Sequence, residues 1–295
     1  MLTIFATPKS FSGHIKTIQT NAVLSWKALQ PSCDIILFGD EEGTAEISRK
    51  LGIKQVAEVE CNEYGTPLVS SMFKIAQDMA ADKLLCYINA DIILMSDFIT
   101  AVRQIEKEQF LMVGRRWDID FDELIDFQKP GWEEELNSGV AREGRLHGVT
   151  GIDYFIFPKG IYDSIPPLAV GRPGWDNWMI YHTRSRKIPV IDATGAVTAV
   201  HQEHGHSDHP GGEEGFWQGP EAKRNIELAG GIDHAFHIGF ADWTLTRQGL
   251  RPARSWSSLY FRLRALPVIN PRWRFLLPLV KLPGKLVGAL RLGQR

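Results

Sequence analysis

The sequence has few cysteines, and their arrangement predicts no covalent framework. Its 295 residues include three, Cys33, Cys61 and Cys86, and no two of them form a CxxC pair. Each stands alone in or beside an apolar run, whereas disulfide-rich domains carry cysteines at regular, closely spaced positions. We therefore expect three buried, reduced thiols.

Long hydrophobic runs are also missing. A membrane-spanning helix needs about 18 or more consecutive apolar residues, and no such stretch occurs. The first residues, MLTIFATPKSF, lack the basic segment followed by a long apolar segment that is typical of a signal peptide. We therefore expect neither a spanning helix nor a signal peptide, and we expect the protein in the cytoplasm.

Internal repeats and low-complexity segments are absent from the sequence as well. Its hydrophobic content of 44% and aromatic content of 10% are those of a globular protein. This supply of apolar residues is enough for a sizeable core, and the length allows one large α/β domain or two smaller ones.

Acidic residues are missing from the C-terminal part of the chain. From Trp243 to Arg295 there are eleven Lys and Arg residues and no Asp or Glu, whereas residues 1–242 hold 22 cations and 35 acids. We therefore divide the chain into a body over residues 1–242 and a basic, apolar extension over residues 243–295. The extension suits the surface of an anionic membrane, and it equally suits packing on the acidic body or on another subunit. The acidic body and the lack of a known nucleic-acid module argue against nucleic-acid binding.

Short apolar runs alternate with amphipathic stretches through the first 95 residues. LTIFAT, CDIILFGD, KQVAEVE and KLLCYINADIIL read as strands, and helical periodicity lies between them. FLMVGRRWDIDFD, GIDYFIFP and IPVIDATGAVTAVHQ read as further strands, and GWDNWMIYHTRSR reads as a helix. Continuous apolar strands alternating with helices indicate an α/β fold with a mostly parallel sheet and helices on both faces.

Polar residues follow the predicted strands, and the carboxyl ends of parallel strands are where ligands bind in such sheets. These residues are Thr7, Lys9, Asp40, Asn89 and Asp91.

The triplet Asn89-Ala90-Asp91 stands at such a strand end. Two oxygen-bearing side chains on one side of the chain can bind a hard divalent cation, which can in turn hold a diphosphate. The sequence has two other matches to this short pattern, Asp118-Ile119-Asp120 and Asp120-Phe121-Asp122. We interpret these as a solvated face of an edge strand, because only Asn89-Asp91 ends an apolar, parallel-type strand. The alternative for Asn89-Asp91 is a polar turn between two short strands.

Residues 1–240 resemble the GT-A class of nucleotide-sugar glycosyltransferases. The resemblance lies in the N-terminal alternating sheet, the DxD-like NAD at a strand end, the later GWDNW and a still later histidine after a strand. It implies that Asp91 and His201 bind Mn²⁺ or Mg²⁺, and that Thr7 and Asp40 lie near the nucleotide base and ribose. Asn89 departs from the pattern, which leaves open whether it binds the metal directly, binds it through water, or holds the ribose or sugar of the donor.

GWDNW bears on the mechanism that the resemblance implies. Inverting GT-A enzymes commonly carry an acidic residue at a helix start in this region, which makes Asp176 the candidate general base for the acceptor hydroxyl. Trp175 and Trp178 offer faces on which a sugar ring can stack. An aspartate at this point is also typical of a helix N-cap. Asp153, which opens a strand, is a candidate for holding donor or acceptor hydroxyls, and a structural hydrogen bond is its alternative role.

The segment HQEHGHSDH raises a second metal hypothesis. His201, His204, His206 and His209 have spacings that occur in zinc sites. Gly205 and Pro210 argue against a helix there, and no cysteine lies nearby. We therefore favour His201 alone as a metal ligand.

Taken together, these features predict a metal-dependent, inverting glycosyltransferase of polysaccharide biosynthesis. It would move a sugar from a nucleotide-diphosphate sugar to a hydroxyl of a glycan or a lipid-linked acceptor, and the extension would attach it to the inner face of a membrane. A sugar-phosphate nucleotidylyltransferase is an alternative, although ATPKSFSGH has one glycine and only Lys9 where that class usually carries a glycine-rich, basic loop. A non-catalytic glycan-binding or membrane scaffold is the other alternative.

Overall fold

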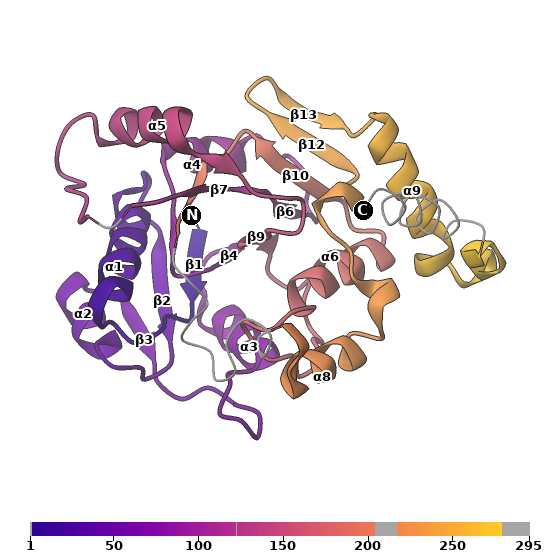
Figure 1. Cartoon of the computed structure of the whole chain (residues 1–295), viewed down its shortest axis with the longest axis horizontal. Coiled ribbons are helices and arrows are strands. Elements are labelled where there is room, and N and C mark those ends of the chain that lie inside the picture. The colour runs from indigo at the N-terminus through magenta and orange to yellow at the C-terminus, as the bar shows by residue number, and fades with distance from the viewer. Residues whose placement is uncertain (1, 122, 204–216, 279–295) are drawn as a thin grey trace, which may run out of the picture.

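A computed structural model describes residues 2–121, 123–203 and 217–278 of the chain (Figure 1). The helices are α1 (Gly13–Ala28), α2 (Thr44–Leu51), α3 (Val69–Met79), α4 (Ser96–Arg103), α5 (Trp132–Glu143), α6 (Trp175–Ser185), α8 (Pro220–Leu228) and α9 (Trp256–Ile269), with short 3₁₀ helices η1 (Ile232–His234), η2 (Ile238–Phe240) and η3 (Pro271–Leu276). The strands are β1 (Leu2–Ala6), β2 (Asp34–Phe38), β3 (Lys54–Val56), β4 (Leu84–Ile88), β5 (Ile92–Ile93), β6 (Leu111–Val113), β7 (Arg116–Ile119), β8 (Arg145–Leu146), β9 (Tyr154–Pro158), β10 (Val190–Gly195), β11 (Ala199–Gln202), β12 (Trp243–Thr246) and β13 (Gly249–Pro252).

A nine-stranded sheet in the order β13-β12-β10-β6-β9-β4-β1-β2-β3 forms the centre of the molecule. Its neighbours are parallel except where β9 pairs with β4 and β6, and where β13 pairs with β12. Because β9 runs against the strands on both of its sides, β1, β2, β4 and β6 all end at the same edge. The expected mostly parallel α/β sheet is confirmed.

Helices cover both faces of this sheet, as the alternating strand residues require (Figure 1). Phe5 points to a hydrophobic cluster that includes side chains of α3 and α6. Its neighbours Ile4 and Ala6 point to a second cluster that includes side chains of α1 and α4. Every residue of β1 is buried, so this strand lies at the centre of the core.

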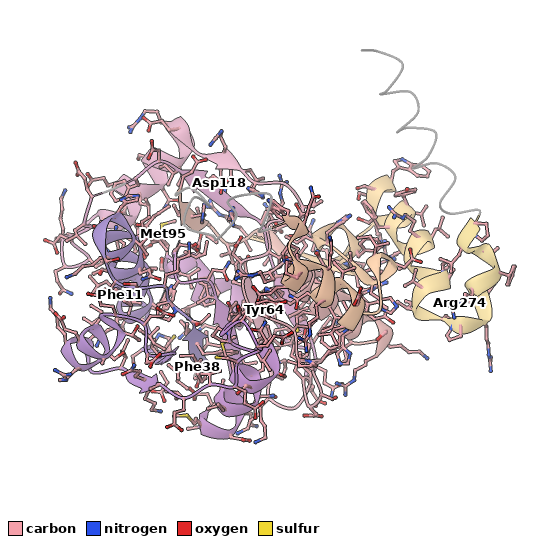
Figure 2. The ribbon with its side chains drawn as sticks, turned by 60° about the horizontal axis from the view of Figure 1, so that its bottom comes forward. Phe11, Phe38, Tyr64, Met95, Asp118 and Arg274 are labelled. Atoms are coloured by element: carbon pink, nitrogen blue, oxygen red, sulfur yellow. The ribbon has the colours of Figure 1, made fainter. Side chains whose placement is uncertain are left out.

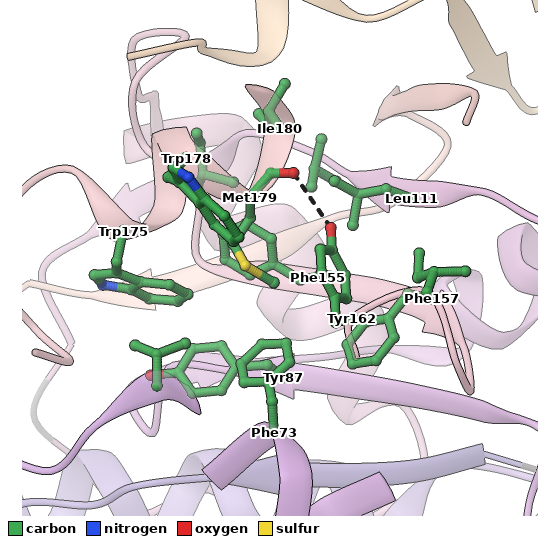
Figure 3. Close-up of a cluster of buried hydrophobic side chains, with 14 of the residues drawn as sticks. Phe73, Tyr87, Leu111, Phe155, Phe157, Tyr162, Trp175, Trp178, Met179 and Ile180 are labelled. Carbon is green, nitrogen blue, oxygen red and sulfur yellow. Dashed lines mark hydrogen bonds between the residues drawn. The ribbon is translucent and has the colours of Figure 1, made fainter. Parts of the chain in front are cut away.

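The face toward α3 and α6 is rich in aromatic rings, which Figure 3 shows at close range. Phe73 of α3 stacks on Phe157 of β9 with ring centroids 5.3 Å apart. Tyr87 of β4 meets the edge of Trp175 at 5.0 Å. The Tyr162 hydroxyl donates to the backbone carbonyl of Met179 at 3.3 Å, which ties α6 to the loop after β9. These contacts fix the first turn of α6 above the end of β4.

The segment CYINADIILM divides into two strands. β4 ends at Ile88 and belongs to the large sheet, Asn89 to Asp91 form a turn, and β5 begins at Ile92 in a different sheet. The turn alternative was therefore right about the backbone. Asp91 nevertheless follows the carboxyl end of the buried strand β4. Because β4 is parallel to β1, both strands end at the same edge of the sheet.

A second, four-stranded sheet lies beside this edge, in the order β5-β11-β7-β8. We expected FLMVGRRWDIDFD to form one strand, but β6 and β7 are separate and belong to different sheets. Val113 ends β6 in the core, and the chain leaves the large sheet at Gly114 before Arg116 opens β7. The second sheet packs on α5 through a small cluster around Ile93 and Leu136.

The boundary expected between residues 242 and 243 is wrong for the described part of the extension. β12 pairs in parallel with β10, and β13 completes a hairpin with it, so residues 243–252 belong to the large sheet. Only the residues after Pro252 leave the sheet, as α9 and η3.

The expectation for the cysteines is confirmed for one residue only. Cys86 is buried in β4, Cys33 is half-buried, and Cys61 is exposed. Among the described residues, no helix is long and apolar enough to cross a membrane.

Candidate functional site

The site is built where the carboxyl ends of β1, β2, β4 and β6 meet. Asn89 and Asp91 follow β4, and Arg115 and Arg116 follow β6. Asp153 comes just before β9, whose first residue, Tyr154, pairs with Ile88 at the end of β4. The antiparallel direction of β9 therefore brings Asp153 to the edge at which the parallel strands end.

Backbone pairing in the second sheet brings a histidine to the same place. In β11, His201 is the register partner of Ile92 on one side and of Asp118 in β7 on the other. Since Asp91 directly precedes Ile92, these pairings place His201 between Asp91 and Asp118. The position of the histidine is thus fixed by ladder hydrogen bonds on both sides of its strand.

Asp91, His201 and Asp118 form an array in which each ring nitrogen of the histidine lies near one carboxylate. The Nε2 atom of His201 lies 3.7 Å from Oδ2 of Asp91, and its Nδ1 atom lies 3.1 Å from Oδ1 of Asp118. The His201 side chain is 9% exposed, and those of Asp91 and Asp118 are 21% and 14% exposed. A carboxylate on one ring nitrogen of a histidine fixes the ring and directs the other nitrogen, which is the usual support of a metal-binding histidine.

Arg116 links two of the carboxylates. Its Nε donates to Oδ1 of Asp118 and its Nη1 donates to Oδ1 of Asp153, both at 2.8 Å. Burial opposes the charge of this guanidinium, but the nearby Asp153, Asp91 and Asp118 raise its pKa above the usual value. The guanidinium therefore stays charged and lies within the electrostatic reach of all three acids.

Asp118 has a further partner in His147. Nδ1 of His147 lies 2.7 Å from Oδ2 of Asp118. Burial alone would raise the pKa of Asp118, but hydrogen bonds from His147 and Arg116 and the charge of Arg116 outweigh it, so that this pKa is lowered. Asp118 is therefore an ionised carboxylate held by two side chains beside His201.

Asn89 braces Asp153. Its Nδ2 donates to Oδ1 of Asp153 at 2.7 Å, and its backbone N–H donates to the Asp153 carbonyl at 2.9 Å. Asp153 is 4% exposed, and its second carboxylate oxygen, Oδ2, is buried without a hydrogen-bond partner in the described part of the chain. Buried acceptors are rarely left unpaired in this way, so Oδ2 is available to a ligand.

Asp176 lies in the first turn of α6, which Gly174 initiates in the left-handed conformation at φ 100°. A side chain at Gly174 would meet Ile226 at 2.8 Å, so glycine is needed for this entry to the helix. Burial raises the pKa of Asp176 to about 6, the backbone N–H of Asn177 opposes this shift, and the charge of Asp153 adds to it. The carboxyl group is enclosed by protein, yet the residue keeps some contact with solvent.

Tyr87 lies within the electrostatic reach of Asp176 and of two other acids of the site. Burial raises the pKa of its hydroxyl, and the carboxylates of Asp91, Asp153 and Asp176 raise it further. All three acids therefore act on the end of one buried side chain at the carboxyl end of β4. The site combines four carboxyl groups, from Asp91, Asp118, Asp153 and Asp176, with the guanidinium of Arg116.

The donor set fits a divalent cation that completes its shell with ligand oxygens. No group of three His, Cys, Asp or Glu side chains that would hold a metal by itself occurs in the described ranges. Asp91 and His201 offer one carboxylate oxygen and one imidazole nitrogen that face each other. Mg²⁺ and similar cations commonly take one or two protein ligands and fill the remaining positions with phosphate oxygens and water. The excess of carboxylates also favours a cation at this point.

The other expected donor contacts lie along the same edge but outside the carboxylate cluster. Thr7 follows β1 and donates its hydroxyl to the carbonyl of Phe38 at 3.3 Å. Lys9 and Asp40 are exposed. The backbone N–H of Lys9 donates to Oε1 of Gln19 at 2.6 Å.

Trp175 and Trp178 are not platforms for a sugar ring. They are 5% and 6% exposed and belong to the hydrophobic core, where Trp175 packs against Tyr87 and Phe155 (Figure 3). We expected Trp175 among the donor-binding residues. The structure corrects this prediction, because both of its ring neighbours are core residues.

Asp118 is the second correction. We expected the acids at 118, 120 and 122 to form a solvated face, but Asp118 is largely buried and holds His201, His147 and Arg116. Asp120 is exposed as expected, and residue 122 lies outside the described ranges. His147 was not expected at the site at all. Of the histidine cluster, only His201 can be placed, because His204, His206 and His209 lie outside the described residues.

Comparisons with known proteins give distant structural likenesses only. No protein-family model matches the sequence, and no curated protein does. S. aureus TarS 1-349 in complex with UDP-GlcNAc is similar with a TM-score of 0.48 and 13% identity, over 91% of this chain and 80% of that one. Glucosyl-3-phosphoglycerate synthase from Mycobacterium tuberculosis, in complex with Mn²⁺, UDP and glucosyl-3-phosphoglycerate, has a TM-score of 0.45 and 12% identity over 80% of each chain.

Another structure of S. aureus TarS 1-349 has a TM-score of 0.42 and 11% identity, and the match spans 70% of this chain and 58% of that one. Likenesses at this level establish neither a family nor an activity for this chain. The chain's own residues must therefore indicate its function.

Proposed function

We propose that the protein is a divalent-metal-dependent glycosyltransferase that uses a nucleotide-diphosphate sugar. The observation that carries the proposal is the array Asp91, His201 and Asp118 at the carboxyl ends of the parallel strands. Ligands of such sheets bind at this edge. An aspartate and a supported histidine facing each other suit a cation that also takes phosphate oxygens, and a diphosphate supplies them.

Asp91 and His201 would hold the cation, Mn²⁺ or Mg²⁺, and Asp118 would keep the imidazole in position. When bound, such a cation neutralises the negative charge that develops on a departing nucleoside diphosphate. Arg116 holds Asp118 and Asp153 in place through hydrogen bonds of 2.8 Å. Oδ2 of Asp153 would accept a hydrogen bond from a hydroxyl of the sugar, and Asn89 would act by bracing Asp153.

Asp176 would be the general base. Its pKa of about 6 means that the group is largely ionised at neutral pH and still binds a proton far better than an ordinary aspartate. These are the properties a carboxylate needs to take the proton of an attacking hydroxyl. A base on the acceptor side supports a single displacement at the anomeric carbon, and therefore inversion of configuration.

The acceptor in this proposal is a hydroxyl of a glycan or of a lipid-linked saccharide. Thr7, Lys9 and Asp40 lie at the ends of β1 and β2, along the same edge, and would surround the nucleotide. The proposed nucleotide contacts of these three residues are supported by their location after the ends of β1 and β2.

Product analysis tests the reaction class. We expect the purified protein, given Mn²⁺ and a panel of nucleotide sugars, to release a nucleoside diphosphate from at least one of them. Water as acceptor would give a slow rate, and a matching glycan would raise it. A product of inverted anomeric configuration by NMR supports Asp176 as the base. Incorporation of pyrophosphate into a nucleotide sugar would instead identify a nucleotidylyltransferase, and the absence of any turnover across donors and acceptors would favour a non-catalytic scaffold.

A further inference from the structure

Helix α9 is apolar on two opposite faces, and within the described residues only one of these faces packs on the body of the protein. On the packed face, Phe261 lies against His237 and Phe240, with ring centroids 4.6 and 4.9 Å apart. Ala265, one turn further on, is fully buried. The helix is thus anchored by this face beside η2.

The opposite face exposes large apolar side chains. Trp256, Leu259, Leu263 and Leu266 are 87%, 47%, 52% and 38% exposed. Their spacings of three, four and three residues place them in one stripe along the helix. The 3₁₀ helix η3 continues the exposure with Trp273 at 45% and Phe275 at 70%. We call these six residues the apolar stripe. Contiguous exposed apolar surface of this kind usually marks an interaction site.

Cations accompany the stripe, and the segment that carries it contains no acid. Arg254, Arg264, Arg272 and Arg274 are exposed within the same segment. No Asp or Glu occurs from Trp243 to the end of the sequence. A partner that complements this surface offers negative charge together with apolar groups.

The surface is separate from the carboxylate site. Figure 2 shows Arg274 at one end of the molecule, far from Asp118, and Figure 1 likewise shows α9 at the periphery, beyond β12 and β13. A partner bound there leaves the edge of the sheet open. Binding of a partner at α9 therefore does not require glycosyl transfer at the carboxylate site.

We propose that the apolar stripe and its arginines dock on an anionic lipid bilayer. Tryptophan, leucine and phenylalanine on one side of a helix insert at the boundary of headgroups and acyl chains, and tryptophan prefers this boundary. Arginine side chains bury their methylene stems there and keep their charge among the headgroups. Anionic headgroups attract each cation near the surface. One end of the molecule thus carries both elements of a peripheral membrane anchor.

The charge of this surface favours a bilayer over a second copy of the chain as its partner. A symmetric dimer through this surface would bring the arginines of both copies into one interface, to which residues 243–295 contribute no acid. Residues 279–295 would not neutralise the surface either, because they contain Lys281, Lys285, Arg291 and Arg295 and no acid. A bilayer of anionic lipid satisfies both the apolar and the charged groups.

Vesicle flotation with the full chain tests the proposal. The vesicles contain either phosphatidylcholine alone or phosphatidylcholine and phosphatidylglycerol in equal amounts. We expect binding to the anionic vesicles, little binding to the neutral ones, and a decrease with added salt. Trp256→Ser/Leu263→Ser and Arg272→Glu/Arg274→Glu should each lower the partition coefficient by roughly tenfold to a hundredfold.

Matched variants elsewhere on the surface are the controls. Leu124→Ser removes an apolar side chain that is 65% exposed on the body, and Arg103→Glu reverses an exposed cation of α4. Both should bind like the wild type, and circular dichroism melting should show that all variants are folded. Equal binding to both vesicle types, no binding to either, or binding that is unchanged in both double variants of this surface would overturn the proposal. A dimer in solution that Trp256→Ser/Leu263→Ser dissociates would overturn it as well.

Discussion

Replacing Asp91 with asparagine is expected to lower turnover of a nucleotide-sugar donor with Mn²⁺ by on the order of a thousandfold. The substitution keeps the size of the side chain but removes the charge that faces Nε2 of His201 at 3.7 Å. A bound cation lowers the activation barrier by several kcal/mol, because it stabilises the departing diphosphate. A variant that no longer holds the cation loses this stabilisation. Steady-state rates of nucleoside diphosphate release, measured with excess Mn²⁺, give the effect.

The control for this experiment is Asp78→Asn. Asp78 is an exposed acid of α3 that pairs with Lys74, and its loss makes the same chemical change away from the site. It should leave turnover unchanged. A rate for Asp91→Asn within about threefold of the wild type would be far below the loss expected for a lost metal ligand and would contradict the assignment.

Replacing Asp176 with asparagine is expected to lower kcat by about a hundredfold to ten-thousandfold, the usual contribution of a general base. In the wild type, activity should rise with pH through about 6, because the carboxyl must lose its proton before it can accept one from the acceptor. The variant should lack this limb of the pH profile. Asp163→Asn, at an exposed acid of the loop after β9, should retain both the rate and the limb.

The melting temperature of Asp176→Asn distinguishes a catalytic role of Asp176 from a structural one. The pKa of Asp176 is raised from 3.8 to about 6, so the folded protein favours the protonated form. Its contribution to stability is therefore fully present below pH 3.8 and is lost as the pH rises through about 6. Asp176→Asn, which carries no charge, should melt no lower than the wild type above this pH. A large loss of melting temperature together with an unchanged pH profile would assign Asp176 a structural role only.

The sequence was sufficient to predict the N-terminal part of the large sheet, because β1, β2 and β4 are each marked locally. LTIFA, DIILF and LLCYI are continuous apolar runs separated by helical periodicity, and all three became parallel neighbours. Asp91 could be placed at the edge for the same reason. The hairpin of β12 and β13 could not be foreseen, because the basic character of the extension concealed two short strands that pair with β10 only in the folded protein.

Asp118 and His147 show what local patterns cannot predict. The role of Asp118 depends on the parallel pairing of β7 with β11, which joins residues 118 and 201 across a long separation in sequence. His147 reaches Asp118 through the antiparallel pairing of β8 with β7. The only signal in the sequence was that Asp118 alternates with the apolar Trp117 and Ile119 in a short strand. That pattern is equally typical of a solvated face. Only the pairing of β7 with its neighbouring strands shows that Asp118 is largely buried.

Binding of nucleoside diphosphates, measured by calorimetry with and without Mn²⁺, tests the central claim most directly. The claim is that Asp91 and His201 hold a cation that binds a diphosphate at the edge of the sheet. We expect at least one nucleoside diphosphate to bind the wild type much more tightly with Mn²⁺, and we expect this enhancement to disappear in both Asp91→Asn and His201→Gln. Binding that is independent of the metal, or an enhancement that both variants retain, would contradict it.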